Sequence, residues 1–193
     1  MRPEEVQLEQ ELLDLWLKLQ SLHKSLRDYT IKKFNRVNPF NENLFNWHEK
    51  GAALGSQNTT IYDSATIVGD VKIGDNTWIG PFVSLDGTGG LTVGSYCSIS
   101  AGVQILTHDT VLWALSAGQQ EYEYASVSIG DCCFIGVQSV IIKGTQIGKH
   151  CLIAANSVVR GNIPDFSIIG GNPAKVIGQV VFDESDKICL CYQ

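Results

Sequence analysis

The sequence predicts a mainly β fold, in which short strands form a stack of three-sided coils, preceded by an amphipathic α-helix. Three observations predict it. An aliphatic residue recurs every six positions over most of the chain, a glycine motif recurs at multiples of about 18 positions, and leucines near the start follow a heptad pattern. The length of 193 residues suits one domain with an appendage.

Composition excludes several classes of protein. Lys and Arg number 14 against 20 Asp and Glu, a net charge of −6, and the cations form no cluster of the kind that binds nucleic acid. With 44% hydrophobic and 18% charged residues, the chain is globular rather than disordered. The early apolar stretch, residues 12–22, is too short to span a bilayer, and we find no secretory signal. We therefore expect a soluble, cytoplasmic protein without stable membrane insertion.

Residues 1–35 are expected to form the helix. Its apolar positions alternate spacings of four and three: Leu8, Leu12, Leu15, Leu19, Leu22, Leu26 and Tyr29. Residues 12–19 are apolar almost all round, so the helix needs its symmetry mates, another part of the assembly or a membrane surface as a partner. The start of the helix is acidic, which argues against an anionic membrane and favours oligomerisation. These acidic residues are Glu4, Glu5, Glu9 and Glu11.

Three further segments complete the expected organisation. Residues 36–58 form a connector laid over the end of the stack, residues 59–170 form the coils with a long loop at 107–128, and residues 171–193 form a C-terminal tail. The connector is rich in Asn and has aromatic anchors, which are Phe40, Phe45 and Trp47.

The six-residue period defines the coils. Each of its 14 positions is Ile, Leu or Val, which indicates one continuous buried face. The positions are Ile61, Ile67, Ile73, Ile79, Leu85, Val93, Ile99, Ile105, Ile129, Ile135, Ile141, Ile147, Ile153 and Val159.

Certain hexads begin with an aliphatic residue, a glycine and a polar turn residue. These are Ile73-Gly74-Asp75, Val93-Gly94-Ser95, Ile129-Gly130-Asp131 and Ile147-Gly148-Lys149. Their separations of 20, 36 and 18 are multiples of 18 once a two-residue insertion near residues 87–90 is removed, which implies three hexads and three strands per coil. We expect Gly where the corner backbone needs an unusual conformation. Six coils at about 4.8 Å each give a rod of about 25–30 Å.

The coils have three faces. The first holds Ile73, Val93, Ile129 and Ile147, the second Ile79, Ile99, Ile135 and Ile153, and the third Leu85, Ile105, Ile141 and Val159. Both interruptions of the period, residues 86–92 and 107–128, follow a strand of the third face. We expect both segments to leave the three-sided stack of coils, which we call the prism, at the same corner on neighbouring coils. Because loops on a rigid repeat scaffold commonly carry function, the site is expected there.

A second inward position accepts only small side chains. It lies three residues after each motif glycine and holds Thr77, Cys97, Cys133 and Cys151. The six cysteines include no CxxC pair, so Cys97, Cys133 and Cys151 are expected to be inert core thiols. Cys132 is expected at a turn, and Cys189 and Cys191 have no assigned role.

These residues carry a family resemblance. The aliphatic-Gly-x-x-small-x hexads and the closing stretch of residues 170–177, Gly-Gly-Asn-Pro-Ala-Lys-Val-Ile, resemble those of the hexapeptide-repeat acyltransferases. The resemblance covers roughly residues 54–178 and is strongest to the sugar acetyltransferases, including the galactoside and maltose acetyltransferases. It implies a left-handed parallel β-helix, whose handedness the residues alone do not predict.

His108 is the candidate general base. It begins the long loop, and of the four histidines only this one lies in a repeat loop at the expected corner. Acyl transfer from a thioester to a hydroxyl, which the resemblance implies, needs a group that accepts the hydroxyl proton. The resemblance implies the same role for a loop histidine at this point. The alternative is a solvated loop histidine beside Asp109.

Asp86 is the second candidate catalytic residue. Leu85 is expected to stack under Ile105, which brings Asp86 to the root of the His108 loop. It would orient the imidazole or bind an acceptor hydroxyl. Part of the family that the chain resembles carries an acidic residue hereabouts. The alternative is a turn residue in Leu85-Asp86-Gly87.

The resemblance implies that acetyl-CoA, the acetyl donor, lies along the coils between adjacent subunits. The candidate residues are Phe134, Gly136, Ala154, Ala155, Arg160 and Lys175. The small ones would let the pantetheine arm approach, and Phe134 takes the place of a Trp in the galactoside enzymes. Arg160 and Lys175 suit the phosphates, although each is equally a solvated surface cation.

Three aromatic residues of the long loop, Trp113, Tyr122 and Tyr124, are candidate substrate-binding residues. Amphipathic aromatic side chains on an exposed loop either stack on a sugar ring or contact a neighbouring subunit. The residues themselves favour the subunit contact.

The expected function is that of a homotrimeric acetyltransferase, which moves acetyl from acetyl-CoA to a sugar hydroxyl in surface-polysaccharide biosynthesis. One alternative is N-acetylation of a nucleotide-linked amino sugar, and another is a non-catalytic assembly rod. A metal lyase on the same prism would need three His per metal, but only His108 and His150 lie in the prism, so no metal is expected.

Overall fold

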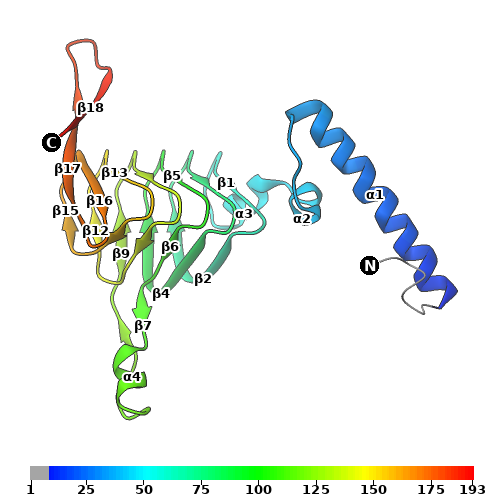
Figure 1. Cartoon of the computed structure of the whole chain (residues 1–193), viewed down its shortest axis with the longest axis horizontal. Helices are drawn as coiled ribbons and strands as arrows, with labels where there is room; N and C mark the ends of the chain where they lie inside the picture. The colour runs from blue at the N-terminus through cyan, green and yellow to red at the C-terminus, as the bar shows by residue number, and fades with distance from the viewer. Residues whose placement is uncertain (1–8) are drawn as a thin grey trace. The chain divides into compact units, whose positions relative to one another are not determined.

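The computed structural model describes residues 9–193 (Figure 1). The chain divides into two compact units, one ending at Asn46 and one beginning at Trp47. Glu4, Glu5 and Leu8 of the expected helix lie outside the described residues.

The first unit contains helices α1 (Gln10–Phe34) and α2 (Phe40–Leu44). Lys32 and Lys33 in the last turn of α1 oppose the negative end of the helix dipole. Asn35 then ends the helix in a left-handed conformation, with its N–H donating to the carbonyl of Ile31. The expected N-terminal helix is confirmed.

Within the first unit, from residue 9 onward, the apolar stripe of α1 is uncovered, since no side chain of Gln10–Phe34 is buried. The largely exposed positions include Leu12, Leu15, Leu19, Leu22 and Tyr29. A stripe of this kind needs a partner, and oligomerisation through it stays a prediction. Across residues 9–193, no helix combines the length and the apolar character needed to cross a bilayer.

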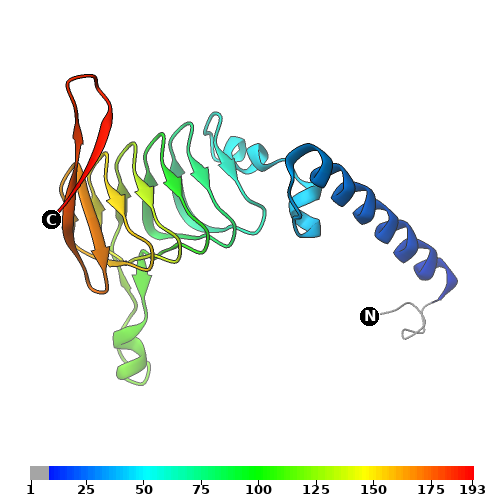
Figure 2. The ribbon, with the colours of Figure 1, turned by 45° about the horizontal axis from the view of Figure 1, so that its top comes forward.

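The second unit begins with α3 (Trp47–Ala53), which packs against the first strand, and continues as a solenoid of short strands (Figure 2). The strands are β1 (Thr60–Ile61), β2 (Thr66–Ile73), β3 (Trp78–Ile79), β4 (Ser84–Val93), β5 (Ser98–Ile99), β6 (Gln104–Ile105), β7 (His108–Asp109), β8 (Glu123–Tyr124), β9 (Val127–Ile129), β10 (Phe134–Ile135), β11 (Val140–Ile141), β12 (Gln146–Ile147), β13 (Leu152–Ile153), β14 (Val158–Val159), β15 (Asn162–Ile163), β16 (Ser167–Gly171), β17 (Ala174–Phe182) and β18 (Ile188–Tyr192), with α4 (Val111–Leu115) between β7 and β8.

Parallel pairing in register creates the three predicted faces. The second face stacks β1, β3, β5, β10, β13 and β16, and its column is Ile61, Ile79, Ile99, Ile135, Ile153 and Ile169. The first and third faces belong to one sheet of order β14-β11-β6-β4-β9-β12-β15, in which β2 pairs with β4. The aliphatic columns of all three faces form one core. The predicted fold class, a left-handed parallel β-helix with an N-terminal helix, is confirmed.

The expectation that residues 86–92 leave the prism is wrong. They belong to β4, which runs without a break around the corner and pairs with β2 from Thr66 to Ile73. The extra residues are taken up by a register shift, since Gly69 pairs with Gly87 but Val71 pairs with Leu91. A β-bulge absorbs an insertion without breaking the ladder, so the corner stays hydrogen-bonded.

The expected reason for the motif glycines is also wrong. Gly74 and Gly130 have no left-handed backbone; a Cβ on Gly74 would come within 2.5 Å of the Ser95 nitrogen one coil away, and one on Gly130 within 2.8 Å of the Gly148 carbonyl carbon. Close approach between coils therefore excludes a side chain. The left-handed residues come two positions after the motif glycine, as at Asn76.

The small inward position is explained by hydrogen bonds to the next coil. Cys97, Cys133 and Cys151 are buried, and their thiols donate to carbonyls at 3.1–3.2 Å, as the Thr77 hydroxyl does to Gly94 at 2.9 Å. A small side chain with a donor fits this position. Cys132 lies at a turn with a left-handed φ of 59°.

One long excursion leaves the solenoid. The chain from β7 to β8 forms an arm, in which these two strands pair antiparallel and α4 lies at the outer end (Figure 2). Val127 and Ser128, expected in the loop, instead lie in β9 and pair with Leu91 and Thr92 of β4. The arm leaves from the corner that follows the third face, because β6 precedes it in the column of Leu85 and Ile105.

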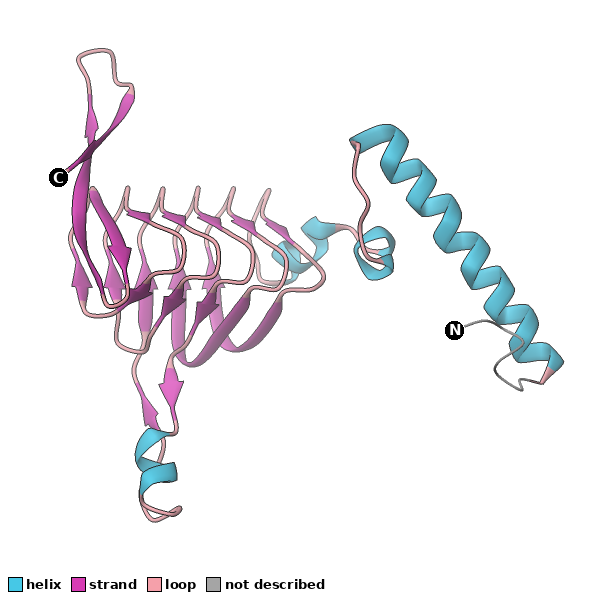
Figure 3. Ribbon diagram, in the orientation of Figure 1, coloured by secondary structure: helices cyan, strands magenta, loops and turns pink. Residues whose placement is uncertain are grey.

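The chain ends in antiparallel strands. β17 pairs with β16, and β18 pairs with β17 as a hairpin that extends beyond the coils (Figure 3). Cys189 and Cys191 lie exposed on β18, and nothing in the structure explains this pair. The four segment boundaries expected from the sequence stay predictions.

Replacing Ile99 with Ala should lower the free energy of unfolding by about 2–5 kcal/mol, because the side chain is fully buried and leaves a cavity. Urea unfolding followed by circular dichroism measures this. The matched control is Ile188→Ala on β18, which is 60% exposed and should change stability by less than about 0.5 kcal/mol. Equal losses in both variants would contradict the assigned core.

Candidate functional site

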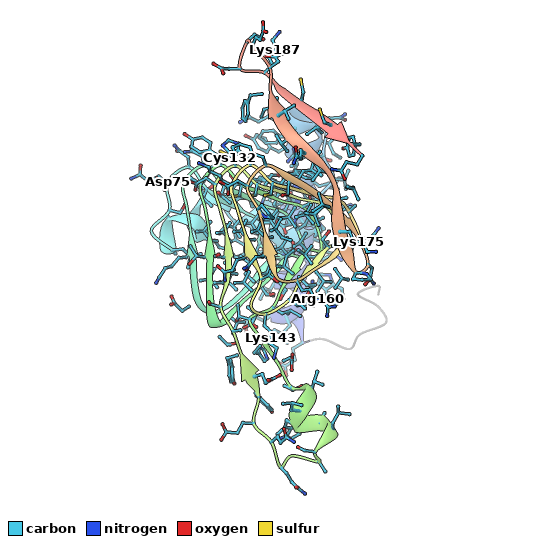
Figure 4. All side chains as sticks on the ribbon, turned by 90° about the vertical axis from the view of Figure 1, so that its left-hand side faces the viewer. Asp75, Cys132, Lys143, Arg160, Lys175 and Lys187 are labelled. Carbon is cyan, nitrogen blue, oxygen red and sulfur yellow. The ribbon has the colours of Figure 1, made fainter. Side chains whose placement is uncertain are left out.

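The site lies at the corner that follows the third face. Strands β4, β6, β11 and β14 pair in register, so Asp86 and Arg160, which follow Leu85 and Val159, come to the same corner three coils apart. Lys143 and Arg160 both lie near the base of the arm in a view along the solenoid, whereas Asp75 lies at another corner (Figure 4).

Asp86 and His108 are in direct contact. Nδ1 of His108 lies 2.6 Å from Oδ2 of Asp86, and the backbone N–H of Thr107 donates to the same oxygen at 3.0 Å. The side chain of Asp86 is 10% exposed and that of His108 is 34% exposed. The structure therefore brings together the two candidate catalytic residues, 22 positions apart in the chain.

Thr88 completes this cluster, and the sequence analysis missed it. Its hydroxyl donates to Oδ1 of Asp86 at 2.7 Å, its backbone N–H donates to the same oxygen at 2.9 Å, and the hydroxyl oxygen lies 3.0 Å from Nδ1 of His108. The available signal was Asp86-Gly87-Thr88, because Asp accepts hydrogen bonds from residues two positions further on.

Hydrogen bonding decides the ionisation of Asp86. Burial by itself raises the pKa of this carboxyl, but hydrogen bonds from Thr88, Thr107 and His108 outweigh burial and hold the pKa well below its usual range. Asp86 is thus a fixed negative charge beside the imidazole.

This contact fixes the role of each imidazole nitrogen. Asp86 is ionised and can only accept, so we assign the proton to Nδ1 of His108. Nε2 of the neutral ring then carries the lone pair. A partly exposed imidazole held in this way can take a proton at Nε2, and the Asp86 carboxylate stabilises the resulting cation.

The arm is held to the solenoid next to this pair. Nζ of Lys143, on the next coil, lies 3.1 Å from Asp109 and 2.7 Å from Glu123, which face each other across β7 and β8. The hydrogen bond from Lys143 to Glu123 is the main reason that the pKa of Lys143 is raised. The ring of Tyr124 stacks on His108 with centroids 5.8 Å apart.

The other aromatic candidates lie further out on the arm. Trp113 and Tyr122 meet edge to face, with ring centroids 5.8 Å apart. Of the three predicted substrate-binding aromatics, only Tyr124 stacks on His108. For the other two, sugar binding and subunit contact both stay predictions.

The candidate acetyl-CoA residues are spread over the later coils. Phe134 on β10 is 45% exposed. Packing between coils by itself requires glycine at position 136, because a Cβ there would lie 2.5 Å from the nitrogen of Ala155 on the next coil. Ala155 is exposed and Ala154 half-buried.

Arg160 and Lys175 are exposed cations, and neither has an ion-pair partner within residues 9–193. They lie toward the same side of the solenoid in Figure 4. This arrangement fits a phosphate-bearing ligand, which would supply the missing negative charge.

In the part of the chain that the structure describes, no three His, Cys, Asp or Glu side chains are arranged to hold a metal ion. The expectation of a metal-free site stays a prediction.

Comparison with known proteins gives a family match for residues 126–161, to the family described as bacterial transferase hexapeptide (six repeats). The putative lipopolysaccharide biosynthesis O-acetyl transferase WbbJ of Escherichia coli is 30% identical over 118 residues, which are 56% of this chain and 60% of that protein. The gamma carbonic anhydrase 2 of Arabidopsis thaliana is 28% identical over 154 residues, 73% of this chain and 55% of that protein. The chain thus spans only a little over half the length of these two relatives.

A solved structure resembles the fold. It is that of AntD, an N-acyltransferase from Bacillus cereus, in complex with dTDP and 3-hydroxybutyryl-CoA. The TM-score is 0.59 at 22% identity, covering 64% of this chain and 70% of AntD. This likeness supports the fold alone.

Ionised Asp86 should make stability depend on pH. The pKa of Asp86 is lowered in the folded chain, so the ionised carboxylate adds to the free energy of unfolding. This contribution is complete above the ordinary Asp pKa of about 4 and is lost as the pH falls below that value. Urea unfolding from pH 7 to pH 3 should therefore show a smaller acid loss in Asp86→Asn than in the native chain. The control is Asp70→Asn, whose side chain is 70% exposed. An identical acid loss in Asp86→Asn and the native chain would contradict the assignment.

Proposed function

We propose that this chain, which belongs to the hexapeptide-repeat transferase family, transfers an acetyl group from acetyl-CoA to a hydroxyl group of a sugar. The observation that carries the proposal is the Asp86–His108 pair, 2.6 Å apart at the corner where the arm leaves the solenoid. The printed name of WbbJ, an O-acetyl transferase, supports the reaction class.

His108 acts as the general base. Its Nε2 accepts the proton of the sugar hydroxyl while the hydroxyl oxygen attacks the thioester carbonyl carbon. A C–O bond forms, the C–S bond breaks, and the CoA thiolate leaves and takes the proton back from the imidazolium. Asp86 stabilises the imidazolium through Nδ1, so it is a positioning residue rather than a nucleophile.

Acetyl-CoA is proposed to bind along the later coils. Arg160 and Lys175 would hold its phosphates, since both lack an ion-pair partner within the described chain. The exposed ring of Phe134 and the small residues at 136, 154 and 155 would border the pantetheine arm. No metal takes part in the proposed reaction.

We further propose that the protein acts as a homotrimer in the cytoplasm, with the exposed leucine stripe of α1 between copies. The acceptor is a saccharide of surface-polysaccharide biosynthesis, which the printed name of WbbJ supports. Trp113, Tyr122 and Tyr124 belong to the acceptor side of the site.

A second candidate is N-acetylation of an amino group on a nucleotide-linked sugar. The printed name of a relative from Aneurinibacillus thermoaerophilus, dTDP-3-amino-3,6-dideoxy-alpha-D-galactopyranose 3-N-acetyltransferase, favours it; that protein is 38% identical over 64 residues, which are 30% of this chain and 33% of that protein. Hydroxyl-bearing and amino-bearing nucleotide sugars assayed side by side discriminate between the two reactions.

His108→Ala should lower kcat by about 10²- to 10⁴-fold, because the hydroxyl loses its general base. Thiol release from acetyl-CoA in the presence of a saccharide acceptor measures this. Thr88→Val should lower kcat by about tenfold, because the variant loses one hydrogen bond to the charged Asp86 while the side-chain volume is kept.

His150→Ala is the matched control, because this histidine stacks on Phe166 at another corner. It should keep turnover close to that of the native chain. Turnover of His108→Ala within about threefold of the native value would remove His108 from the mechanism.

Arg160→Met should raise the KM for acetyl-CoA by about tenfold and the KM for the acceptor by much less, because a charge-assisted contact to phosphate is lost. The control is Lys187→Met, in the distant turn of the β17–β18 hairpin (Figure 4). An unchanged KM for acetyl-CoA would place the phosphates elsewhere.

A further inference from the structure

The arm carries an open hollow of about 590 Å³, which lies beyond His108 on the side of α4. It is lined by Trp113, Gly118, Gln119, Gln120, Glu121, Tyr122 and Tyr124. Three aromatic rings, two carboxamides and one carboxylate therefore surround a single depression. The residues from 118 to 121 belong to none of the groups assigned above.

The hollow has a defined shape, because its backbone is held from within. Gly118, at a φ of 82°, turns the chain back against the indole of Trp113, and its N–H donates to the carbonyl of that residue at 2.7 Å. The hydroxyl of Ser116 accepts the backbone N–H groups of Gln119 and Gln120 at 3.1 and 2.8 Å. Pre-organisation of this kind lowers the entropy cost of binding.

The polar side-chain groups of the hollow are open to a ligand. Within residues 9–193, the carboxamides of Gln119 and Gln120, the carboxylate of Glu121 and the hydroxyls of Tyr122 and Tyr124 make no hydrogen bond to another side chain or backbone group. These groups include both donors and acceptors beside flat apolar rings. A sugar presents the matching combination, hydroxyl groups around a ring with an apolar face.

The hollow is connected to the proposed catalytic residue. Tyr124 lines it and also stacks on His108, with ring centroids 5.8 Å apart. Lys143 holds the root of the arm to the next coil through Asp109 and Glu123. A ligand in the hollow would therefore contact the same tyrosine ring that stacks on His108.

The charge of the residues that line the hollow discriminates between uncharged and phosphate-bearing acceptors. Glu121 is its single ionisable group apart from the tyrosines, and no Lys or Arg is among the seven lining residues. A phosphate placed there would meet a carboxylate and no cation. The lining thus suits an uncharged sugar unit better than the diphosphate of a nucleotide sugar.

We propose that this hollow is a second acceptor subsite, which binds an uncharged sugar unit next to the unit acetylated at His108, so that the acceptor is a saccharide chain. This proposal rests on the proposed function and specifies its acceptor. The indole of Trp113 packs on the sugar ring, while Gln119, Gln120 and Glu121 bind its hydroxyls.

Kinetics with chains of increasing length tests the subsite. The probes are neutral hexasaccharides of glucose, galactose and N-acetylglucosamine with their monosaccharides, assayed with acetyl-CoA and the full chain. At least one hexasaccharide should have a kcat/KM about tenfold above that of its monosaccharide, the effect of about 1.4 kcal/mol of added binding. Trp113→Ala and Gln120→Ala should each bring this ratio toward one.

Leu115→Ala is the matched control, because Leu115 lies on the same helix, is 82% exposed and does not line the hollow. It should keep the native ratio. Gln120→Ala guards against misfolding of the arm, since only the backbone of Gln120 makes an internal hydrogen bond. An unchanged ratio in both Trp113→Ala and Gln120→Ala would overturn the subsite.

Binding to the His108→Ala variant separates the subsite from the reaction. Saturation-transfer NMR with the same hexasaccharides should show binding that Trp113→Ala removes, even where no acetyl is transferred. Such binding without turnover in the native chain would support the subsite and count against the proposed function. Absence of binding by every hexasaccharide, or a change of oligomeric state in Trp113→Ala by sedimentation, would overturn the subsite in favour of a subunit contact.

Discussion

Stacking of the coils in register is the constraint on which the second unit depends. Each aliphatic column repeats one coil further on, so that Leu85 lies beside Ile105 and Ile105 beside Ile141. The spacing between coils leaves no room for a Cβ at Gly74 or Gly130. The same spacing brings residues that are far apart in sequence to one corner. The site proposed at that corner is a consequence of how the core packs.

At this corner a buried carboxylate is stabilised by its neighbours. Asp86 is nearly buried, and leaving it without partners would cost several kcal/mol. Four hydrogen bonds, from the backbone and hydroxyl of Thr88, from Thr107 and from His108, satisfy it instead. The bond with His108 is the one that joins solenoid to arm. Lys143 adds a second connection between solenoid and arm, through Asp109 and Glu123.

The faces could be predicted because each inward side chain packs against its equivalents one coil away. These inward positions appear in the sequence as an aliphatic residue at every sixth position. The nearness of Asp86 to His108 followed from that register. The sequence did not predict whether residues 86–92 form a loop, because this depends on pairing with β2. The composition of the segment does not indicate a β-bulge. The contact of Thr88 depends on that bulge and on side-chain rotamers. The hollow on the arm depends on how a segment without a repeat folds back on Trp113, which periodicity does not describe.

The central claim is that stacking places Asp86 where it fixes the imidazole of His108 with its proton on Nδ1. Nitrogen-15 NMR of the histidine side chains, recorded at about pH 8, where an ordinary imidazole is neutral, tests it most directly. The His108→Ala variant identifies the signals of His108. The account predicts a protonated Nδ1 and an unprotonated Nε2 for this ring, and loss of that preference in Asp86→Asn. A proton on Nε2 in the native chain would contradict it.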